Sequence, residues 1–232
     1  MHYELQRAGL SGVLLQLAEV ITPGLPLQLR ALREYLLAAL PDLGLQITPS
    51  YTSLLLEYDL LQISHAAFLE RLHPLLQGWQ APVLDTTQAA VIEIPVFYDL
   101  TTGPDLPRVA EQAGLAVDAV ITLHAATAYE VCALGFAPGF AYLASVPLAL
   151  RTPRLTTPRS RVPAGSVALA DQQTAVYPQE SPGGWNLIGR TPLRMFDAKR
   201  SPPSVLQPGQ QVRFVPVDQH TFVQLGGVLD AG

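Results

Sequence analysis

Residues 134–143 read LGFAPGFAYL, an apolar and aromatic stretch that Gly135, Pro138 and Gly139 interrupt. Proline lacks a backbone N–H and glycine weakens a strand interior, so this stretch fits neither a helix nor a central strand. Its rings therefore belong either to a buried connection that packs with them or to a pocket wall that presents them to a ligand. The residues alone leave both interpretations open.

The chain around this stretch has the composition of short strands joined by turns. Eleven of the 21 prolines lie between Pro138 and Pro208, which nearly excludes long helices there. The even spacing of the remaining strand-like segments predicts a barrel or sandwich, which we place at residues 91–232. These segments are YEVCALGF (129–136), GSVALAD (165–171), TAVYP (174–178), WNLIGRT (185–191) and QQVRFVPV (210–217).

Residues 1–90 are predicted to form a small α/β domain. Leucines recur at helical spacing up to Pro41, and Ser64 is a suitable N-cap for a second helix. The element order β-α-β-β-α-β is that of a ferredoxin-like split βαβ fold, within an α+β class. The predicted segments are residues 12–20 (strand), 25–40 (helix), 43–59 (two strands), 64–79 (helix) and 89–98 (strand).

Residues 103–127 are predicted to form two helices that turn at Gly114, a size typical of a helix-turn-helix. The second helix carries Asp118 and neither lysine nor arginine, so it has no cation for a phosphate backbone. We therefore expect no nucleic-acid partner and interpret the pair as a helical connection that covers one end of a sheet.

The composition of the whole chain indicates a globular protein. Of its 232 residues 49% are hydrophobic and 14% are charged, and no run of about 18 uncharged apolar residues occurs that would span a membrane. The N-terminus does not resemble a secretory signal. The single cysteine, Cys132, alternates with apolar residues, which favours a buried, inert thiol. A chain without an internal disulfide fits a reducing compartment, so a cytoplasmic location is expected.

Charge is distributed unevenly along the chain. The formal net charge is −5, but residues 151–200 hold eight basic and three acidic side chains, whereas the remainder holds six basic and sixteen acidic ones. Arginine predominates among the basic residues, and its planar guanidinium matches two oxygens of a carboxylate or phosphate. The cluster is therefore either a solvated loop surface or a site for an anionic ligand.

Within this basic region the sequence places several polar groups near a turn. Arg159 and Arg161 lie two apart, on one side if the chain is extended. Glu180 and Ser181 precede Gly183 and Gly184, consecutive glycines that favour close approach of backbone N–H groups to an anion. Trp185, Asn186 and Arg190 follow. This set suits a small molecule that bears a carboxylate, although the two glycines also fit a simple hairpin.

Other chemistries have weaker support. No P-loop motif occurs, no GxSxG motif surrounds Ser181, and the five histidines show no metal-ligand spacing, so no metal site is expected in this chain. His124 precedes the aromatic stretch and is a candidate acid or base, but its position favours a packed or capping histidine.

Two long motifs together resemble a known family. LGFAPGFAYL and TPRSRVPAGSVALADQQTAVYPQESPGGWNLIGRTP (157–192) are similar to the family of KipI and the 5-oxoprolinase B subunit, also called allophanate hydrolase subunit 1. The resemblance is dense over residues 90–217. It implies a cyclophilin-like β-barrel in residues 91–232 and partners of two kinds, a protein like the 5-oxoprolinase C subunit and a LamB/YcsF-type protein as the A subunit. The implied activity is the ATP-dependent hydrolysis of 5-oxoproline to glutamate.

The resemblance also implies roles and alternatives. ATP with magnesium would act in the assembled complex, with no tightly bound cofactor in this chain alone, and the substrate would be a small lactam or amide. A KipI-like inhibitor of a sensor histidine kinase and a protein that processes allophanate or a urea amide are the alternatives. The candidate residues are Glu180 and His124 for catalysis; Arg159, Arg161, Tyr177, Ser181, Gly183, Gly184, Trp185, Asn186 and Arg190 for substrate or anion binding; and Phe136, Pro138, Gly139, Phe140 and Tyr142 for a pocket wall or subunit interface.

Overall fold

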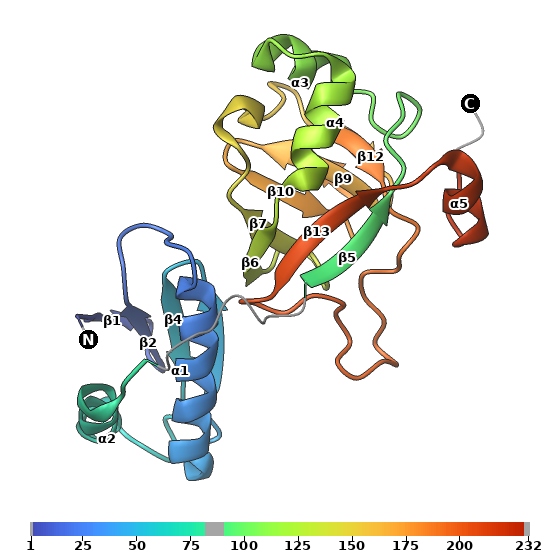
Figure 1. Ribbon diagram of the computed structural model, residues 1–232. Helices are drawn as coiled ribbons and strands as arrows, with labels where there is room; N and C mark the ends of the chain where they lie inside the picture. The colour runs from blue at the N-terminus through green and yellow to red at the C-terminus, as the bar shows by residue number, and fades with distance from the viewer. Residues whose placement is uncertain (1, 82–90, 230–232) are drawn as a thin grey trace. The chain divides into compact units, whose positions relative to one another are not determined.

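The computed structural model describes residues 2–81 and 91–229 (Figure 1). Contacts between Cα atoms divide the chain into two compact units, Met1–Gln88 and Ala89–Gly232. The predicted domain boundary at residue 90 falls in a segment outside the described residues. Each unit is described below by itself.

The first unit is an antiparallel sheet with two helices. Its strands lie in the order β1-β2-β4-β3. Leu29, Leu32 and Leu36 of α1 are fully buried, and Ser64 caps α2 by accepting a hydrogen bond from the N–H of Ala67. The elements are β1 (Glu4–Ala8), β2 (Gly12–Gln16), α1 (Leu25–Ala39), η1 (Pro41–Leu43), β3 (Gln46–Ser50), β4 (Ser53–Glu57) and α2 (His65–Gly78).

The predicted split βαβ arrangement holds only in part. β2, β4 and β3 lie side by side as that fold requires, but the position next to β2 is taken by β1 (Glu4–Ala8). That strand was missed because its sequence, ELQRA, is polar and mostly exposed. The expectation that residues 89–98 complete this sheet is wrong, since β5 (Val91–Val96) pairs with β13 (Gln211–Pro216) in the second unit.

The second unit contains a curved antiparallel sheet with one parallel pair. β6, β7, β10, β9 and β12 follow one another, and β13 pairs antiparallel with β6 and parallel with β5. β8 and β11 form a separate two-stranded sheet. The further elements are β6 (Tyr129–Leu134), β7 (Ala141–Ala144), η2 (Leu148–Leu150), β8 (Arg159–Val162), β9 (Ser166–Ala170), β10 (Gln173–Val176), β11 (Ser181–Gly183), β12 (Asn186–Arg190) and α5 (Gln219–Gln224).

The two outer strands of this sheet meet at one bridge. Phe97, directly after β5, and Arg190, the last residue of β12, exchange backbone hydrogen bonds of 2.8 and 3.0 Å. A single bridge brings the edges together without the continuous ladder of a closed barrel. The structure therefore establishes a mixed α/β chain with a large antiparallel sheet, and the cyclophilin-like barrel stays a prediction.

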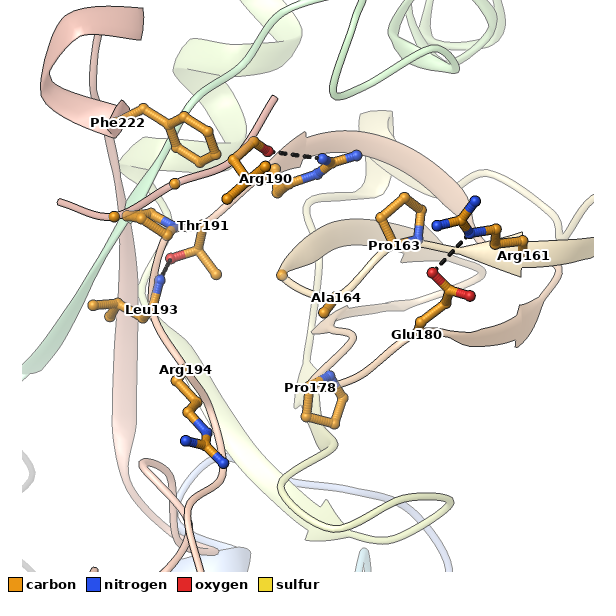
Figure 2. A pocket seen from close by; sticks show the side chains of 15 residues that line it. Arg161, Pro163, Ala164, Pro178, Glu180, Arg190, Thr191, Leu193, Arg194 and Phe222 are labelled. Atoms are coloured by element: carbon orange, nitrogen blue, oxygen red, sulfur yellow. Dashed lines mark hydrogen bonds and ion pairs between the residues drawn. The ribbon is translucent and has the colours of Figure 1, made fainter. Parts of the chain in front are cut away.

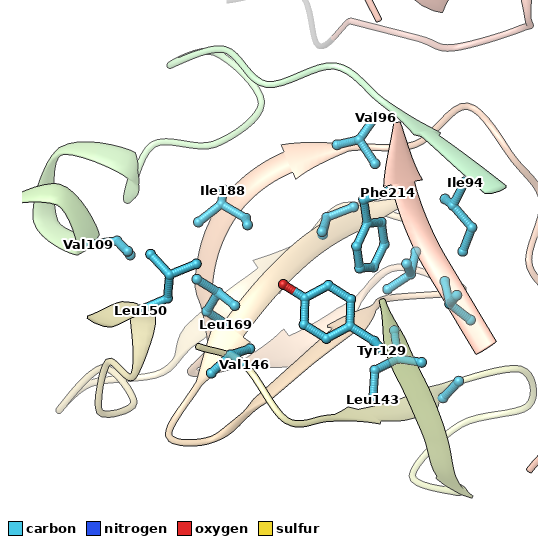
Figure 3. Close-up of a cluster of buried hydrophobic side chains, with 14 of the residues drawn as sticks. Ile94, Val96, Val109, Tyr129, Leu143, Val146, Leu150, Leu169, Ile188 and Phe214 are labelled. Atoms are coloured by element: carbon cyan, nitrogen blue, oxygen red, sulfur yellow. The ribbon is translucent and has the colours of Figure 1, made fainter. Parts of the chain in front are cut away.

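Apolar side chains from both ends of the second unit's sequence fill the space inside this curved sheet (Figure 3). Tyr129 of β6 and Phe214 of β13 lie at its centre, and both are fully buried. The predicted helix pair is confirmed as α3 (Leu106–Ala113) and α4 (Val117–Ala126), with Gly114 in the left-handed conformation that ends α3. Val109 and Val120 of these helices pack against the same core.

No helix within residues 2–81 and 91–229 combines the length and hydropathy that crossing a bilayer would need.

Candidate functional site

Part of the aromatic stretch at residues 134–143 lines a surface hollow, and part of it packs in the core. It joins β6 to β7, and Phe136 has a left-handed backbone with a ring that is 66% exposed. Phe136, Pro138 and Gly139 line an open hollow of about 560 Å³, whose opposite wall includes Phe196. A Cβ on Gly139 would lie only 2.7 Å from the Cβ of Phe196, so the close approach of these two walls requires glycine.

Phe140 points the other way, into a buried aromatic cluster. Its ring lies 4.8 Å from that of Tyr142, 5.3 Å from Tyr177 and 5.8 Å from Trp185, measured between centroids. Burial raises the pKa of the Tyr177 hydroxyl, and Trp185 is 5% exposed with the guanidinium of Arg154 at 5.7 Å from its ring centroid. Tyr177 and Trp185 are therefore core residues, and their rings are not exposed to a ligand in the way that the sequence predicted.

The two glycines serve close packing. Gly183 belongs to β11, and a Cβ there would overlap the Tyr177 hydroxyl. Neither Gly183 nor Gly184 has the positive φ that would favour glycine in a turn or nest. The predicted anion nest at these residues is therefore wrong, and Gly183 is glycine because the buried Tyr177 ring lies against its backbone.

Asn186 and Ser181 are also turned inward. Asn186 is fully buried, donates from Nδ2 to the carbonyl oxygens of Pro153 and Leu169, and accepts a hydrogen bond from Arg108 at Oδ1. The Ser181 hydroxyl is buried without a hydrogen-bond partner among the described residues. The amide of Asn186 holds β12 to neighbouring segments, so it is not available to a ligand.

Arg159 is bound to an acidic residue that is distant in the sequence. Its Nη2 lies 2.9 Å from Oδ1 of Asp105, and Oδ2 of the same carboxylate accepts a 2.7 Å hydrogen bond from the N–H of Leu187. Asp105 precedes α3 and is 7% exposed. The carboxylate therefore fixes the start of α3 to both β8 and β12, and Arg159 is a structural residue in this arrangement.

Replacing Asp105 by asparagine should lower the free energy of unfolding by about 2 kcal/mol, because a buried, charge-assisted hydrogen bond to Arg159 is lost. Urea denaturation measures the loss. The matched control is Asp171→Asn, since Asp171 forms an exposed 3.6 Å ion pair with Arg154. The control should change stability by less than about 0.5 kcal/mol. Equal effects of the two substitutions would contradict the structural role of Asp105.

Three arginines and one glutamate surround a separate cavity of about 360 Å³ (Figure 2). They are Arg161, Arg190, Arg194 and Glu180, and the walls between them are formed by loops and by the C-terminal segment. Of the predicted catalytic and anion-binding residues, the structure brings together only Arg161, Glu180 and Arg190 here. The wall between these groups is made by Pro163, Ala164, Gly165, Pro178, Thr191, Pro192, Leu193, Phe222, Gly226, Gly227 and Val228.

The three arginines differ in how firmly they are held. Arg190 is 7% exposed and donates from Nη1 to the carbonyl oxygen of Val228 at 3.1 Å. Arg161 donates from Nε to Oε2 of Glu180 at 2.7 Å, and its side chain is 73% exposed. Arg194 is similarly exposed, donates from Nε to the carbonyl oxygen of Phe196 and forms a 3.6 Å ion pair with Asp197. An anion entering the cavity would thus meet one fixed and two adjustable guanidinium groups.

Arg194 was not among the predicted site residues. It belongs to the same basic region, but it lies in the irregular segment after β12, where no strand periodicity indicates the direction of a side chain. No local pattern in the sequence indicates that Arg194 and Arg190 line the same cavity.

His124 lies in the core and outside the residues that line the cavities described here. It is fully buried, and burial lowers its pKa to about 3. The hydroxyl of Thr174 donates to the carbonyl oxygen of Ala168 and so accepts from Nε2 of His124, which leaves Nδ1 to accept from Tyr98 at 2.7 Å. The interpretation as a packed histidine is correct, and the structure offers it no path to a substrate as acid or base.

Two further sequence predictions concern thiol and metal chemistry. Cys132 is buried, and burial raises the pKa of its thiol to about 12, as expected for an inert side chain. Among the described residues, no group of three or more histidine, cysteine, aspartate or glutamate side chains could hold a metal ion.

A protein-family model described as "Carboxyltransferase domain, subdomain C and D" matches residues 3–206, most of this chain. This chain belongs to the carboxyltransferase-domain family. The family resemblance read from the two sequence motifs is thereby confirmed. The matched part of this carboxyltransferase chain includes Arg161, Glu180, Arg190 and Arg194, whereas the cavity wall from Phe222 onward lies beyond it.

Curated relatives share one name, that of the 5-oxoprolinase B subunit. The carboxyltransferase chain is 47% identical over 148 residues to the protein of that name from Escherichia coli O157:H7, covering 64% of this chain and 68% of that one. It is 33% identical over 231 residues to the protein of the same name from Bacillus subtilis (strain 168), covering 96% of both. The likeness therefore extends over both units of the chain.

Solved structures share the fold. A crystal structure of TTHA0988 matches with a TM-score of 0.77 and 43% identity, covering 89% of this chain and 40% of that one. This carboxyltransferase chain thus spans about two fifths of the length of that protein. Urea carboxylase of Kluyveromyces lactis matches with a TM-score of 0.72 over 96% of this chain and 22% of its own, and at 19% identity this shows a likeness of fold alone.

Proposed function

We propose that this chain is the B subunit of an ATP-dependent 5-oxoprolinase, which hydrolyses 5-oxoproline to glutamate with a protein like the 5-oxoprolinase C subunit and a LamB/YcsF-type protein as the A subunit. The observation that carries the proposal is the 33% identity to a 5-oxoprolinase B subunit over 96% of both chains. The chain by itself would then be inactive. A cyclophilin-like organisation of residues 91–232 is part of the same proposal.

The cavity between Arg161, Arg190 and Arg194 is where the anionic part of the substrate would bind. 5-Oxoproline carries one carboxylate beside its lactam ring, and the planar guanidinium group matches both oxygens of a carboxylate or phosphate. Among the described residues that line the cavity, three arginines and one glutamate carry charge, so positive charge is in excess there. This arrangement favours an anion over a neutral amide.

The proposed reaction requires an activated lactam. Transfer of the terminal phosphoryl group of ATP to the lactam oxygen would make that oxygen a good leaving group. Water would then add to the ring carbon, and the C–N bond would break as the nitrogen takes a proton, which leaves an acyl phosphate of glutamate. A second water would cleave this acyl phosphate, so that glutamate and phosphate are released after the ADP of the first step. Guanidinium groups of this chain would stabilise the negative charge that develops on the phosphoryl oxygens.

The described residues contain no group of three or more acidic, histidine or cysteine side chains that could hold a metal ion. Magnesium that accompanies ATP would be bound mainly by phosphate oxygens and water. We therefore derive no step through it from this chain.

The double substitution Arg161→Gln with Arg194→Gln should lower kcat/KM for glutamate formation at least tenfold in the reconstituted complex of three proteins, because two charge contacts to the anion are lost. Both side chains are mostly exposed, so the chain should still fold. The measurement is glutamate release that depends on both ATP and 5-oxoproline.

The matched control is Arg213→Gln, since Arg213 is half-exposed, forms an ion pair with Glu93 and lies outside the lining of the cavity. It should keep the wild-type rate. Wild-type turnover by the double variant would remove these arginines from the site. Failure of the wild-type complex to release glutamate would reject the proposed function itself.

A further inference from the structure

The ion pair between Arg161 and Glu180 lies at the lining of the cationic cavity (Figure 2). Arg161 belongs to β8, and Glu180 directly precedes β11. These two strands pair with Ser181 opposite Val162, so the backbone holds the two side chains close together. The carboxylate of Glu180, a group of the protein itself, is thus bound to an arginine of the proposed anion site.

This ion pair contributes little to the stability of the fold. The side chains of Arg161 and Glu180 are 73% and 52% exposed, and exposed ion pairs shift a folding equilibrium by about fivefold at most. By contrast, Arg159 on the same strand is held by Asp105, whose side chain alone is 9% exposed. Glu180 can therefore leave Arg161 at little cost, whereas Asp105 cannot leave Arg159.

Glu180 carries the same chemical group as a carboxylate ligand. A ligand oxygen that binds Nε of Arg161 must compete with Oε2 of Glu180, which already lies 2.7 Å from that nitrogen. Arg190 is buried and donates to the carbonyl oxygen of Val228, so its guanidinium keeps a fixed position in the same cavity. A ligand held by Arg190 would reach the Nε donor of Arg161 only after Glu180 moves aside.

We propose that Glu180 holds the place of the ligand on Arg161, and that a small carboxylate or phosphate anion displaces it on binding. The inference rests on the proposed function only for the identity of the anion. After displacement the Glu180 carboxylate remains beside the ligand, and repulsion grows with the charge of the ligand. Glu180 is therefore a specificity-determining residue that disfavours a dianion more strongly than a monoanion.

The test is calorimetric titration of the full-length chain with two probes, 5-oxoproline and inorganic phosphate, at low ionic strength. Glu180→Gln keeps the size of the side chain and removes its charge. We expect it to lower the Kd for 5-oxoproline about fivefold and the Kd for phosphate about tenfold or more. Near neutral pH phosphate carries more negative charge than 5-oxoproline, which accounts for the larger gain.

Two further variants separate this inference from a general effect of charge. Asp171→Asn removes the same charge from an exposed ion pair outside the cavity lining, and it should leave both Kd values unchanged within about twofold. In a chain that already carries Arg161→Gln, adding Glu180→Gln should lower the Kd for 5-oxoproline by less than it does in the wild-type chain, because it then relieves only the repulsion and frees no arginine.

Several results would overturn the proposal. They are an unchanged or raised Kd in Glu180→Gln, an equal gain in Asp171→Asn, a full gain in the absence of Arg161, and no binding of either probe to any variant. The proposed function fails separately, when the assembled wild-type complex binds the probes but releases no glutamate.

Discussion

Acid should destabilise the second unit of this protein by roughly 4 kcal/mol between pH 6.5 and pH 3 through a single side chain, His124. Burial lowers the pKa of this imidazole to about 3 from its ordinary value of 6.5. The unfolded chain therefore binds a proton in this range and the folded chain does not. The contribution is fully present above pH 6.5 and is lost as the pH falls toward 3.

The surroundings of His124 explain why protonation is so costly. Its ring is stacked on Phe214 at 4.7 Å and lies against Tyr129 at 5.2 Å between centroids. Nδ1 accepts from the hydroxyl of Tyr98 and Nε2 donates to Thr174. A second proton on the ring would occupy Nδ1 and so remove the hydrogen bond that Tyr98 donates there. The resulting charge would be buried in an apolar core, which is costly.

Urea denaturation at a series of pH values tests this expectation. Between pH 6 and pH 5 the slope of the unfolding free energy should approach about 1.4 kcal/mol per pH unit. The substitution His124→Gln should flatten this slope, because it removes the group whose pKa is lowered by burial. Because His124→Gln is at risk of not folding, NMR titration of the wild-type imidazole is the second measurement. Titration of His124 near pH 6.5 in the folded chain would contradict the prediction.

Gly183→Ala should lower the free energy of unfolding by about 3 kcal/mol. The added Cβ would overlap the Tyr177 hydroxyl and lie 2.8 Å from Cζ of the same ring. That ring is 2% exposed and meets Phe140 edge-on, so it has no free space to move into. Either the aromatic cluster or strand β11 must shift to accept the methyl group.

The neighbouring glycine is the control for this prediction. A Cβ on Gly184 would find its nearest atom, Cγ of Pro158, at 3.5 Å, an ordinary contact. Gly184→Ala should change stability by less than about 0.5 kcal/mol, or raise it slightly because alanine restricts the unfolded chain. Thermal and urea denaturation of both variants measure the difference. Equal stability of the two variants would show that Tyr177 does not require glycine at position 183.

Local patterns predicted most elements of the fold. The leucine spacing of α1, the Ser64 cap of α2 and the turn at Gly114 are short-range signals, and the structure confirms the helices that they predicted. Strand β1 was missed because its side chains are polar and mostly exposed, so no alternation marks it. β5 was assigned to the wrong sheet because its partner, β13, begins more than 110 residues later in the sequence.

The candidate site was predicted less well, for a related reason. Strand alternation places Arg159 and Arg161 on the same side of β8, but Arg159 is bound by Asp105, 54 residues earlier, and Arg161 by Glu180, 19 residues later. Tyr177, Trp185 and Asn186 have side chains suited to a ligand, yet each fills the interior of the unit. Residue type indicated which side chains carry a charge or an aromatic ring, while burial depended on which segments packed against each side chain.

The sequence by itself determined the family of this chain, the change from helices to short strands and turns, and the concentration of arginine in residues 151–200. Only the tertiary structure decided that Arg161, Arg190 and Arg194 line one cavity and that Arg159 and His124 do not. The physical reason is that local sequence sets backbone conformation and charge, whereas a cavity forms where strands and loops from distant parts of the chain converge. Its lining therefore depends on pairings between residues that no local pattern encodes.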